Sequence, residues 1–368
     1  MNAYDLAKPY LFRLDPERAH DLVTRALALA SRSAVAPRLL EAFAPAHDPR
    51  LEVELFGLKF PNPLGLAAGL DKNGVAFPAL AALGWRPRVS LAEGVEIGSV
   101  TALAQPGNPQ PRLFRLVEDE ALINRMGFNN LGAAAMAARL ERLGRHELRG
   151  RAGRTVLGIN VGKSRAVDVS EAAADYRASL TAVWPHADYL VINVSSPNTP
   201  GLRTLQRSEP LAELFGVVAE LRAALGRKPV LLKLAPDLDD AELADLVATA
   251  EAVGVDGLVA TNTTLAREGL RSPQREETGG LSGRPLTARS LAVLEHLRGR
   301  TSLPIVAVGG IFGAHDALER LAAGADLLQV YTGFIYRGPA LVGEVLGGIA
   351  RELDRRGADD VTKLSGRG

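Results

Sequence analysis

Between about residues 50 and 350, short apolar runs alternate with stretches whose apolar residues recur at helical spacing. The apolar runs end in polar or glycine-rich turns and cover residues 63–69, 94–100, 155–160, 188–194, 229–236, 256–264, 304–310 and 326–333. Helical periodicity is clearest in 239–254 and 314–324, and Asp239 is among the residues that offer an N-cap for the first of these. Continuous apolar strands that alternate with helices are typical of a parallel sheet buried on both faces.

Eight such strands predict an α/β fold, a closed (β/α)8 TIM barrel, which typically needs about 250 residues. An open doubly wound sheet is the alternative, but no GxGxxG motif follows the first run, which weakens that option. We assign residues 46–350 to the barrel and residues 1–45 to a small N-terminal helical extension. Residues 351–368 form a polar C-terminal tail, which we expect to fray.

Two helices are predicted before the barrel, over residues 3–14 and 15–33. Asp15 followed by Pro16 is an N-cap with proline at the first helical position. The second helix has a broad apolar face, and basic residues accompany both helices. This pattern fits a helical hairpin packed on the barrel equally well as an amphipathic element that lies on a membrane surface and covers an apolar entrance.

Composition excludes several classes of function. The chain has 368 residues, a formal net charge of +1, 5% aromatic residues and no cysteine. The small charge and the few aromatic residues argue against a nucleic-acid-binding protein, and the lack of cysteine excludes disulfides, cysteine–zinc sites and thiolate chemistry. No metal site is predicted. No apolar stretch approaches the roughly 18 residues of a spanning helix, and residues 1–10 lack the pattern of a secretory signal, so we expect the cytoplasm, including its membrane face.

Polar residues collect where the apolar runs end. Those at or just after the carboxyl end of a predicted strand are Lys72, Ser99, Asn160, Asn193 with Ser196, Lys233, Asn262, Gly310 and Tyr331. In a parallel barrel these ends share one rim, which is where active sites lie. Asparagine has both a donor and an acceptor, so several of them suit a ring of alternating N–H and C=O groups. The set predicts a ligand site on the rim, because separate turn caps are a poor explanation for so many residues.

Two lysines and a glycine-rich turn indicate the kind of ligand. Lys233 interrupts an apolar run, where an unpaired ammonium is costly to bury, so it reaches either an anionic or electron-accepting ligand or a carboxylate elsewhere in the chain. Lys72 suits a carboxylate or electron-rich ring atoms, or else is a surface lysine beside Asp71. The glycines of 309–313 lie between a strand and a helix, where backbone N–H groups bind phosphate in many barrels.

Two further residues are ambiguous when taken alone. Ser196 precedes Pro197, so it fits a serine turn as well as a catalytic hydroxyl. Asn124 lies near Phe128 and fits either a turn or a contact with a planar ligand.

Motifs along the chain resemble those of the quinone-dependent, membrane-associated dihydroorotate dehydrogenases. In order, they are AAGLDKNG (67–74), EIGSVT (96–101), GNPQPRLFRL (107–116), NRMGFNN (124–130), GINVGKS (158–164), NVSSPNTPGLR (193–203), LLKLAPDL (231–238), ATNTT (260–264), TGGLSG (278–283), VGGI (308–311) and VYTG (330–333). The resemblance runs from DPERAH (15–20) to past residue 340.

This resemblance implies an FMN-containing barrel that oxidises dihydroorotate to orotate in pyrimidine (UMP) biosynthesis. Electrons would pass to ubiquinone or menaquinone, which would enter through the N-terminal helical pair. The protein would then lie on the cytoplasmic face of the cell membrane as a peripheral protein. The oligomeric state stays open, with a monomer among the options.

The resemblance also implies roles residue by residue. Ser196 would be the base that removes a proton from C5 of dihydroorotate, and FMN N5 would take the hydride from C6. The orotate ring and carboxylate would lie against Lys72, Asn124, Arg125, Met126, Gly127, Phe128, Asn193, Asn198, Asn262 and Thr263. FMN would lie along Ala67, Ala68, Gly69, Leu70, Asp71, Ser99, Asn160, Asn193, Lys233, Thr261, Gly283, Gly310, Tyr331 and Thr332. The quinone passage would include His20 and Arg115.

The chain departs from the family pattern in two places. The segment 84–95 is longer and more polar than the usual link, and Ala102 stands where proline is common. Soluble relatives use cysteine as the base, and this chain has none. Because serine is a weak base, it must pass its proton onward, through water, in a closed site.

Two other hypotheses stay open at this point. Another FMN-dependent barrel oxidoreductase, acting with NAD(P)H or on a different substrate, would share Lys233 and Gly310. A phosphate-ligand-binding barrel or membrane-surface adaptor without catalysis would have the rim but no flavin.

Overall fold

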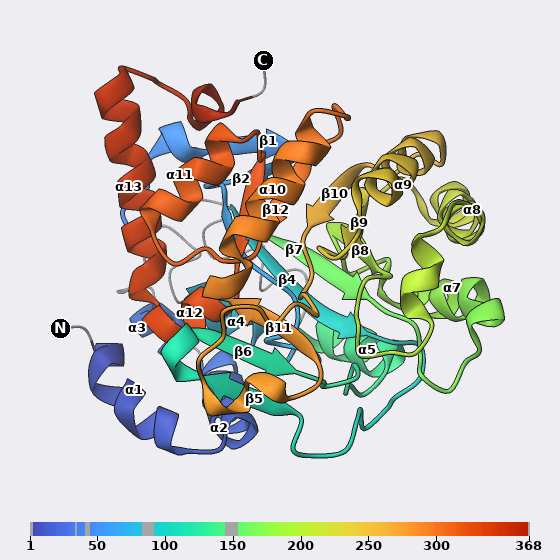
Figure 1. Ribbon diagram of the computed structural model, residues 1–368, viewed down its shortest axis with the longest axis horizontal. Helices are drawn as coiled ribbons and strands as arrows, with labels where there is room; N and C mark the ends of the chain where they lie inside the picture. Colours follow the sequence, from blue (N-terminus) through green and yellow to red (C-terminus); the bar gives the residue numbers. More distant parts are fainter. Residues whose placement is uncertain (1–2, 34, 41–44, 83–91, 144–153, 367–368) are drawn as a thin grey trace.

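A closed barrel of parallel strands forms the body of the protein (Figure 1). The computed structural model describes residues 3–33, 35–40, 45–82, 92–143 and 154–366. In order around the barrel, the strands are β10 (Gly257–Ala260), β12 (Ile305–Val308), β13 (Leu327–Val330), β3 (Leu64–Leu66), β4 (Ala92–Val100), β7 (Arg154–Val161), β8 (Tyr189–Asn193) and β9 (Val230–Leu234). Each predicted apolar run contributes one strand, so the predicted (β/α)8 barrel is confirmed.

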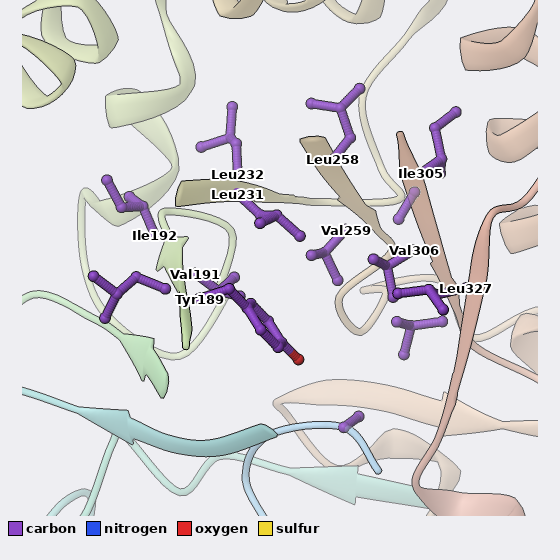
Figure 2. Close-up of a cluster of buried hydrophobic side chains, with 14 of the residues drawn as sticks. Tyr189, Val191, Ile192, Leu231, Leu232, Leu258, Val259, Ile305, Val306 and Leu327 are labelled. Atoms are coloured by element: carbon purple, nitrogen blue, oxygen red, sulfur yellow. The ribbon is translucent and has the colours of Figure 1, made fainter. Parts of the chain in front are cut away.

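The strands close on one another because their side chains are apolar on both faces. Every residue of β8, β9, β10 and β12 is buried. Figure 2 shows Val191, Leu231, Val259 and Val306, one from each of these strands, in one cluster with Tyr189. Side chains fill the interior of such a barrel, which makes it a packed core and not a pore. The core thus occupies the barrel interior and the layer between strands and helices.

Helices surround the barrel (Figure 1). Those of the barrel region are α4 (Phe77–Leu80), α5 (Ala133–Leu143), α7 (Ala172–Val183), α8 (Ser208–Leu225), α9 (Asp240–Ala252), α10 (Thr287–Arg298), α11 (Ala314–Ala322), α12 (Thr332–Arg337) and α13 (Ala340–Arg356). Helix α9 begins where predicted: Asp239 Oδ1 accepts from Glu242 N at 2.8 Å, and Glu242 Oε2 accepts from Asp239 N at 2.9 Å. This capping box satisfies backbone donors that the first turn leaves free.

A small antiparallel sheet, which the sequence analysis did not predict, consists of β5 (Leu113–Leu116), β6 (Ala121–Asn124) and β11 (Gly280–Gly283). In its register Gly280 lies opposite Asn124, and Leu281 lies opposite Ile123. The pairing brings two motifs that are far apart in the sequence to the same side of the barrel.

A short hairpin of β1 (Val53–Leu55) and β2 (Leu58–Phe60) contacts the amino-terminal part of the barrel. A Cβ atom added to Gly257, the first residue of β10, would lie 2.9 Å from the ring of Phe56. The hairpin therefore packs against the end of the barrel opposite to the strands' carboxyl ends.

Two helices precede the barrel, as predicted: α1 (Ala3–Arg13) and α2 (Pro16–Ser31), followed by the short α3 (Ala36–Leu40). Asp15 is the N-cap of α2, since its Oδ1 accepts hydrogen bonds from Glu17 N at 3.1 Å and Arg18 N at 3.0 Å. Helix α2 contacts α4 and β5, so it lies against both the barrel and the small sheet (Figure 1).

The prediction that residues 351–368 fray is wrong for the described part of this tail. Helix α13 continues to Arg356, and a 3₁₀ helix follows over Val361–Leu364. Val361 and Leu364 are buried, so two apolar side chains in a polar sequence hold the tail on the protein. The polar segment 84–95 lies mostly outside the described residues, and β4 begins at Ala92.

A buried ion pair ties α2 to the barrel. Arg112 Nη2 donates to Glu17 Oε1 at 2.7 Å, and both residues are 8% exposed. Arg112 Nη1 also donates to the backbone oxygens of Pro106 at 2.6 Å and Asn108 at 2.8 Å. The pair therefore joins the N-terminal helices to the loop that precedes the small sheet.

We predict that Glu17→Ala lowers the free energy of unfolding by about 3–5 kcal/mol, because it leaves the Arg112 guanidinium buried without its counter-ion. Urea unfolding of the purified protein measures this change. Glu213→Ala, on the exposed face of α8, is the control and should change stability by no more than about 0.5 kcal/mol. A loss below about 1 kcal/mol for Glu17→Ala would show that the pair is not a structural anchor.

Candidate functional site

A cavity opens at the carboxyl ends of the barrel strands and encloses about 1210 Å³, counting the part open to solvent. Predicted site residues that line it are His20, Ala67, Ala68, Gly69, Lys72, Ser99, Asn124, Met126, Gly127, Phe128, Asn193, Ser196, Asn198, Lys233, Thr261, Asn262, Thr263, Gly283, Gly310, Tyr331 and Thr332. The barrel rim, the small sheet and α2 each contribute to this wall. The structure therefore brings together residues that are spread over most of the chain.

Five predicted site residues lie outside the cavity lining: Leu70, Asp71, Arg115, Arg125 and Asn160. Leu70 is partly buried and packs against the core. Asp71 is buried and accepts hydrogen bonds from the backbone N–H groups of Val75 at 2.9 Å and Ala76 at 2.7 Å. Burial raises the pKa of the Asp71 carboxyl, and these backbone donors act against that shift. Asp71 therefore fixes the loop that carries Lys72.

The two arginines point elsewhere. Arg125 Nη1 donates to Glu277 Oε2 at 2.7 Å, beside the small sheet. Arg115 Nη1 donates to the backbone oxygens of Phe12 at 3.0 Å and Leu14 at 3.3 Å, and its guanidinium lies 4.3 Å from the centre of the Phe12 ring. Arg115 therefore belongs to the contact between α1 and the small sheet.

Asn160 lies beneath the cavity floor and is fully buried. Its Nδ2 donates to Glu96 Oε1 at 2.8 Å, which leaves its Oδ1 to accept from Ser99 Oγ and, at 3.1 Å, from Asn193 Nδ2. Gln329 Nε2 donates to the second oxygen of Glu96 at 2.8 Å. A carboxylate inside the barrel thus sets the orientation of two carboxamides that support the floor.

Asn124, Asn193, Asn198 and Asn262 form one wall of the cavity, the asparagine wall, and a second hydrogen-bond network links their amide groups. Asn262 Nδ2 donates to Asn193 Oδ1 at 3.2 Å and to Ser195 Oγ at 2.9 Å. Asn198 Nδ2 donates to Asn124 Oδ1 at 3.3 Å and to the Asn124 backbone oxygen at 3.0 Å. These contacts hold four asparagines from three separate segments around one space.

Ser196 lines that space and is 7% exposed. Its Oγ accepts a hydrogen bond from Asn198 N at 3.3 Å, so the serine turn suggested by the sequence is present. The same residue therefore shapes the loop and presents a hydroxyl to the cavity. Among the described residues, no histidine or carboxylate bonds to Ser196 Oγ.

Three basic side chains face the cavity in a setting that disfavours their charged forms. Burial lowers the pKa of Lys72 to about 8, and Arg112 adds to this shift. Burial also lowers the pKa of Lys233, against the attraction of Glu96. For His20, burial and then the charge of Lys72 lower the pKa to about 3. The imidazole is therefore neutral at physiological pH.

The glycine turn lies between a strand and a helix, as predicted: β12 ends at Val308 and α11 begins at Ala314. Gly309 and Gly310 have φ values of 122° and 67°, which favour glycine. A Cβ atom on Gly310 would lie 2.4 Å from Thr287 Cα, so no larger residue fits there. Thr287 Oγ1 donates to the Gly310 backbone oxygen at 3.0 Å, which fixes the turn.

Several lining residues were missed by the sequence analysis: Leu113, Leu122, Ser282, Leu286, Val308, Ile311, Gln329, Val330 and Gly333. Gln329 could have been found, because it interrupts an apolar run just as Lys233 does. Leu113 and Leu122 could not, because they reach the cavity from the unpredicted small sheet.

The described part of the chain contains neither a cluster of metal-ligating side chains nor a helix that could span a membrane. No group of three or more histidine or acidic side chains is placed to hold a metal ion there. Within the same described ranges, no helix is long and apolar enough to cross a membrane.

Fold and site together define a class of α/β-barrel enzymes. The cavity at the carboxyl ends of the strands combines an asparagine wall, two lysines and a glycine turn suited to phosphate. A sequence model described as dihydroorotate dehydrogenase matches residues 50–353. The chain therefore belongs to the dihydroorotate dehydrogenase family.

Individual relatives agree with this assignment over the full length of the chain. The chain is 49% identical to a dihydroorotate dehydrogenase (quinone) of Gloeobacter violaceus, covering 100% of this chain and 99% of the relative. It is also 49% identical to a dihydroorotate dehydrogenase (quinone) of Thermus thermophilus, covering 96% and 98%. The crystal structure of DHODH from Eimeria tenella in complex with ferulenol superposes with a TM-score of 0.85 at 38% identity, covering 97% of this chain and 98% of that one.

We predict that His20 makes the protein less stable as the pH falls from about 6.5 towards 3. In this window the unfolded chain binds a proton that the folded protein, with its lowered His20 pKa, does not bind. Urea unfolding of wild type and His20→Gln across the window measures the effect, and the variant should lose less stability on acidification. His315→Gln is the control, because this side chain is 85% exposed. Parallel curves for wild type and His20→Gln would contradict the prediction.

Proposed function

We propose that this protein oxidises dihydroorotate to orotate in pyrimidine biosynthesis, with FMN as hydride acceptor and a membrane quinone as final electron acceptor. Relatives that match the whole chain are named dihydroorotate dehydrogenase (quinone), which supports the reaction and the acceptor. The observation that carries the proposal is the meeting of the asparagine wall, Ser196, Lys233 and the glycine turn in one cavity.

The residues present are suited to FMN. The turn at Gly309 and Gly310 and the first turn of α12, at Thr332, offer backbone N–H groups to a phosphate. Lys233 would hold the electron-accepting part of the ring system. A Cβ atom on Gly69 would lie 3.5 Å from the Tyr331 ring, so the glycine leaves this space beside the ring to the cofactor. When bound, FMN supplies the N5 atom that accepts a hydride.

The asparagine wall would recognise the substrate. Dihydroorotate alternates N–H donors and C=O acceptors around its ring, and the amides of Asn124, Asn193, Asn198 and Asn262 match such a pattern. Lys72 would bind the carboxylate, and its pKa of about 8 leaves it mostly charged at neutral pH. The network between these amides fixes their orientation before the substrate arrives.

Ser196 would remove the proton from C5 of dihydroorotate. A hydroxyl is a weak base, so the proton must leave Ser196 as it accepts the new one. With no histidine or carboxylate bonded to its Oγ among the described residues, we assign the relay to water in the cavity. Burial of Ser196 would limit exchange with bulk solvent during this step.

We predict that Ser196→Ala lowers the rate of flavin reduction by dihydroorotate about 10²- to 10⁴-fold, the usual contribution of a general base, while FMN stays bound. Anaerobic stopped-flow absorbance of the bound flavin measures this rate. Ser195→Ala is the matched control. The Ser195 hydroxyl contacts Asn193 and Asn262 but does not line the cavity, so its loss should mainly change the KM for dihydroorotate.

The same anaerobic measurement of flavin absorbance tests the function itself. Wild-type protein should be yellow, and dihydroorotate, but not NADH, should bleach its flavin. Bleaching by NADH alone would favour a different FMN-dependent oxidoreductase, and purified protein without flavin would favour a phosphate-binding barrel. An unchanged rate in Ser196→Ala would refute the assignment of the base.

The N-terminal helices support a quinone passage at a membrane surface. Exposed large apolar residues cluster there: Leu6, Tyr10, Leu14, Leu22, Val23, Leu29, Val35 and Leu39. His20 lines the cavity from α2, and Arg115 contacts the end of α1. A quinone that enters between these helices would reach the flavin without crossing water.

We predict that Leu22→Asn/Leu29→Asn weakens binding to phosphatidylglycerol vesicles at least about tenfold, because burial of each leucine contributes about 1.5–3 kcal/mol. These side chains are 55% and 71% exposed on α2. Vesicle co-sedimentation measures the partition. Leu225→Asn, on α8 away from the helical pair and 44% exposed, is the control and should not change it. Equal binding by all three proteins would remove α2 as the membrane contact.

A further inference from the structure

Arg320 is a buried cation that none of the roles above uses. It lies on α11 with 1% of its surface exposed. Among the described residues no carboxylate forms an ion pair with its guanidinium, and all of its hydrogen-bond acceptors are backbone oxygens or a hydroxyl. The carboxylates of Asp316 and Glu319 attract the guanidinium from a distance but do not contact it. Arginine stays charged in proteins, and a buried charge that no anion contacts is costly. This cost calls for a compensating anion or a strong structural reason.

The contacts of Arg320 converge on the glycine turn. Its Nη2 donates to the Gly309 backbone oxygen at 2.7 Å, to Ser290 Oγ at 3.1 Å and to the Thr287 backbone oxygen at 3.2 Å. Ser290 Oγ donates to the same Gly309 oxygen at 3.0 Å. Two donors therefore hold this one carbonyl on the side of α10 and α11.

The opposite side of the turn faces the cavity. Gly309, Gly310 and Ile311 all line it. In the described part of the chain, the N–H groups of Gly310 and Ile311 have no hydrogen-bond acceptor. With the Gly309 and Gly310 carbonyl oxygens both engaged behind the turn, these free N–H groups form a nest for an anion.

We infer that Arg320 is the positioning residue for the phosphate end of FMN: it fixes the glycine turn by its carbonyl and places a positive charge directly behind the anion nest. The inference rests on FMN as the cofactor. In a low-dielectric interior, a charge acts over several ångströms on a phosphate that it does not touch. The phosphate in turn would add an anion to the attraction that Asp316 and Glu319 already exert on Arg320.

This role predicts that Arg320 discriminates between flavins. FMN and riboflavin share the isoalloxazine ring and ribityl chain, and only FMN carries the phosphate. Loss of Arg320 should therefore weaken FMN binding and leave riboflavin binding unchanged. A purely structural arginine would affect both flavins alike.

The test is competitive exchange on the purified holoprotein. Wild type, Arg320→Met and Arg320→Lys are equilibrated with FMN and excess riboflavin, and the bound flavins are separated by chromatography. We expect the preference for FMN over riboflavin to fall at least tenfold in Arg320→Met and less than threefold in Arg320→Lys, which keeps the charge. Arg222→Met is the control and should keep the wild-type preference: this arginine of α8 is partly buried and pairs with Asp256, away from the glycine turn.

An unchanged preference in Arg320→Met, or an equal loss of both flavins in folded protein, would overturn the inference. Should Arg320→Met not fold, Arg320→Gln replaces it, since it can still donate to the Gly309 carbonyl but carries no charge. A failure of the proposed cofactor looks different: wild-type protein itself would then show no preference for FMN.

Discussion

The site depends on the parallel pairing of the barrel strands. Because the strands run in one direction, each chain segment that leaves a carboxyl end enters the same rim, and polar residues in those segments must share one space. Ala67 and Thr332 lie in different quarters of the sequence and line the same cavity, since β3 and β13 are neighbours in the closed barrel. The apolar side chains that close the barrel thus place the chemistry as well.

Polar groups inside the barrel are the counterpart of this constraint. Glu96 is 1% exposed, yet it accepts hydrogen bonds from Asn160 and Gln329 and attracts Lys233. A carboxylate and an ammonium in the same interior attract each other, and this attraction offsets part of the free-energy cost of removing each charge from water. A chain of hydrogen bonds therefore leads from the barrel interior to the cavity: Glu96 orients Asn160, Asn160 orients Asn193, and Asn193 lines the cavity.

The sequence was sufficient for the barrel and most of the rim because both follow from local patterns, apolar runs and the turns after them. It could not place Asn160 below the floor, since successive strand side chains alternate between faces and a strand-end residue fits either. The small sheet was missed because its pairing joins Ile123 to Leu281, a contact with no local signature. The order of the tail depends likewise on two buried residues, Val361 and Leu364, that read as isolated positions in a polar segment.

The N-terminal helices look like an appendage in the sequence, but their contacts make them part of the cavity. Glu17 holds Arg112, Arg112 holds the loop of Asn108, and Asn108 Nδ2 donates to the backbone oxygens of Arg125 at 2.8 Å and Asn198 at 3.4 Å. His20 lines the same space directly. A change in the position of α2 therefore reaches the asparagine wall through a continuous set of contacts. The side that would admit quinone and the side that would bind dihydroorotate are two walls of one cavity.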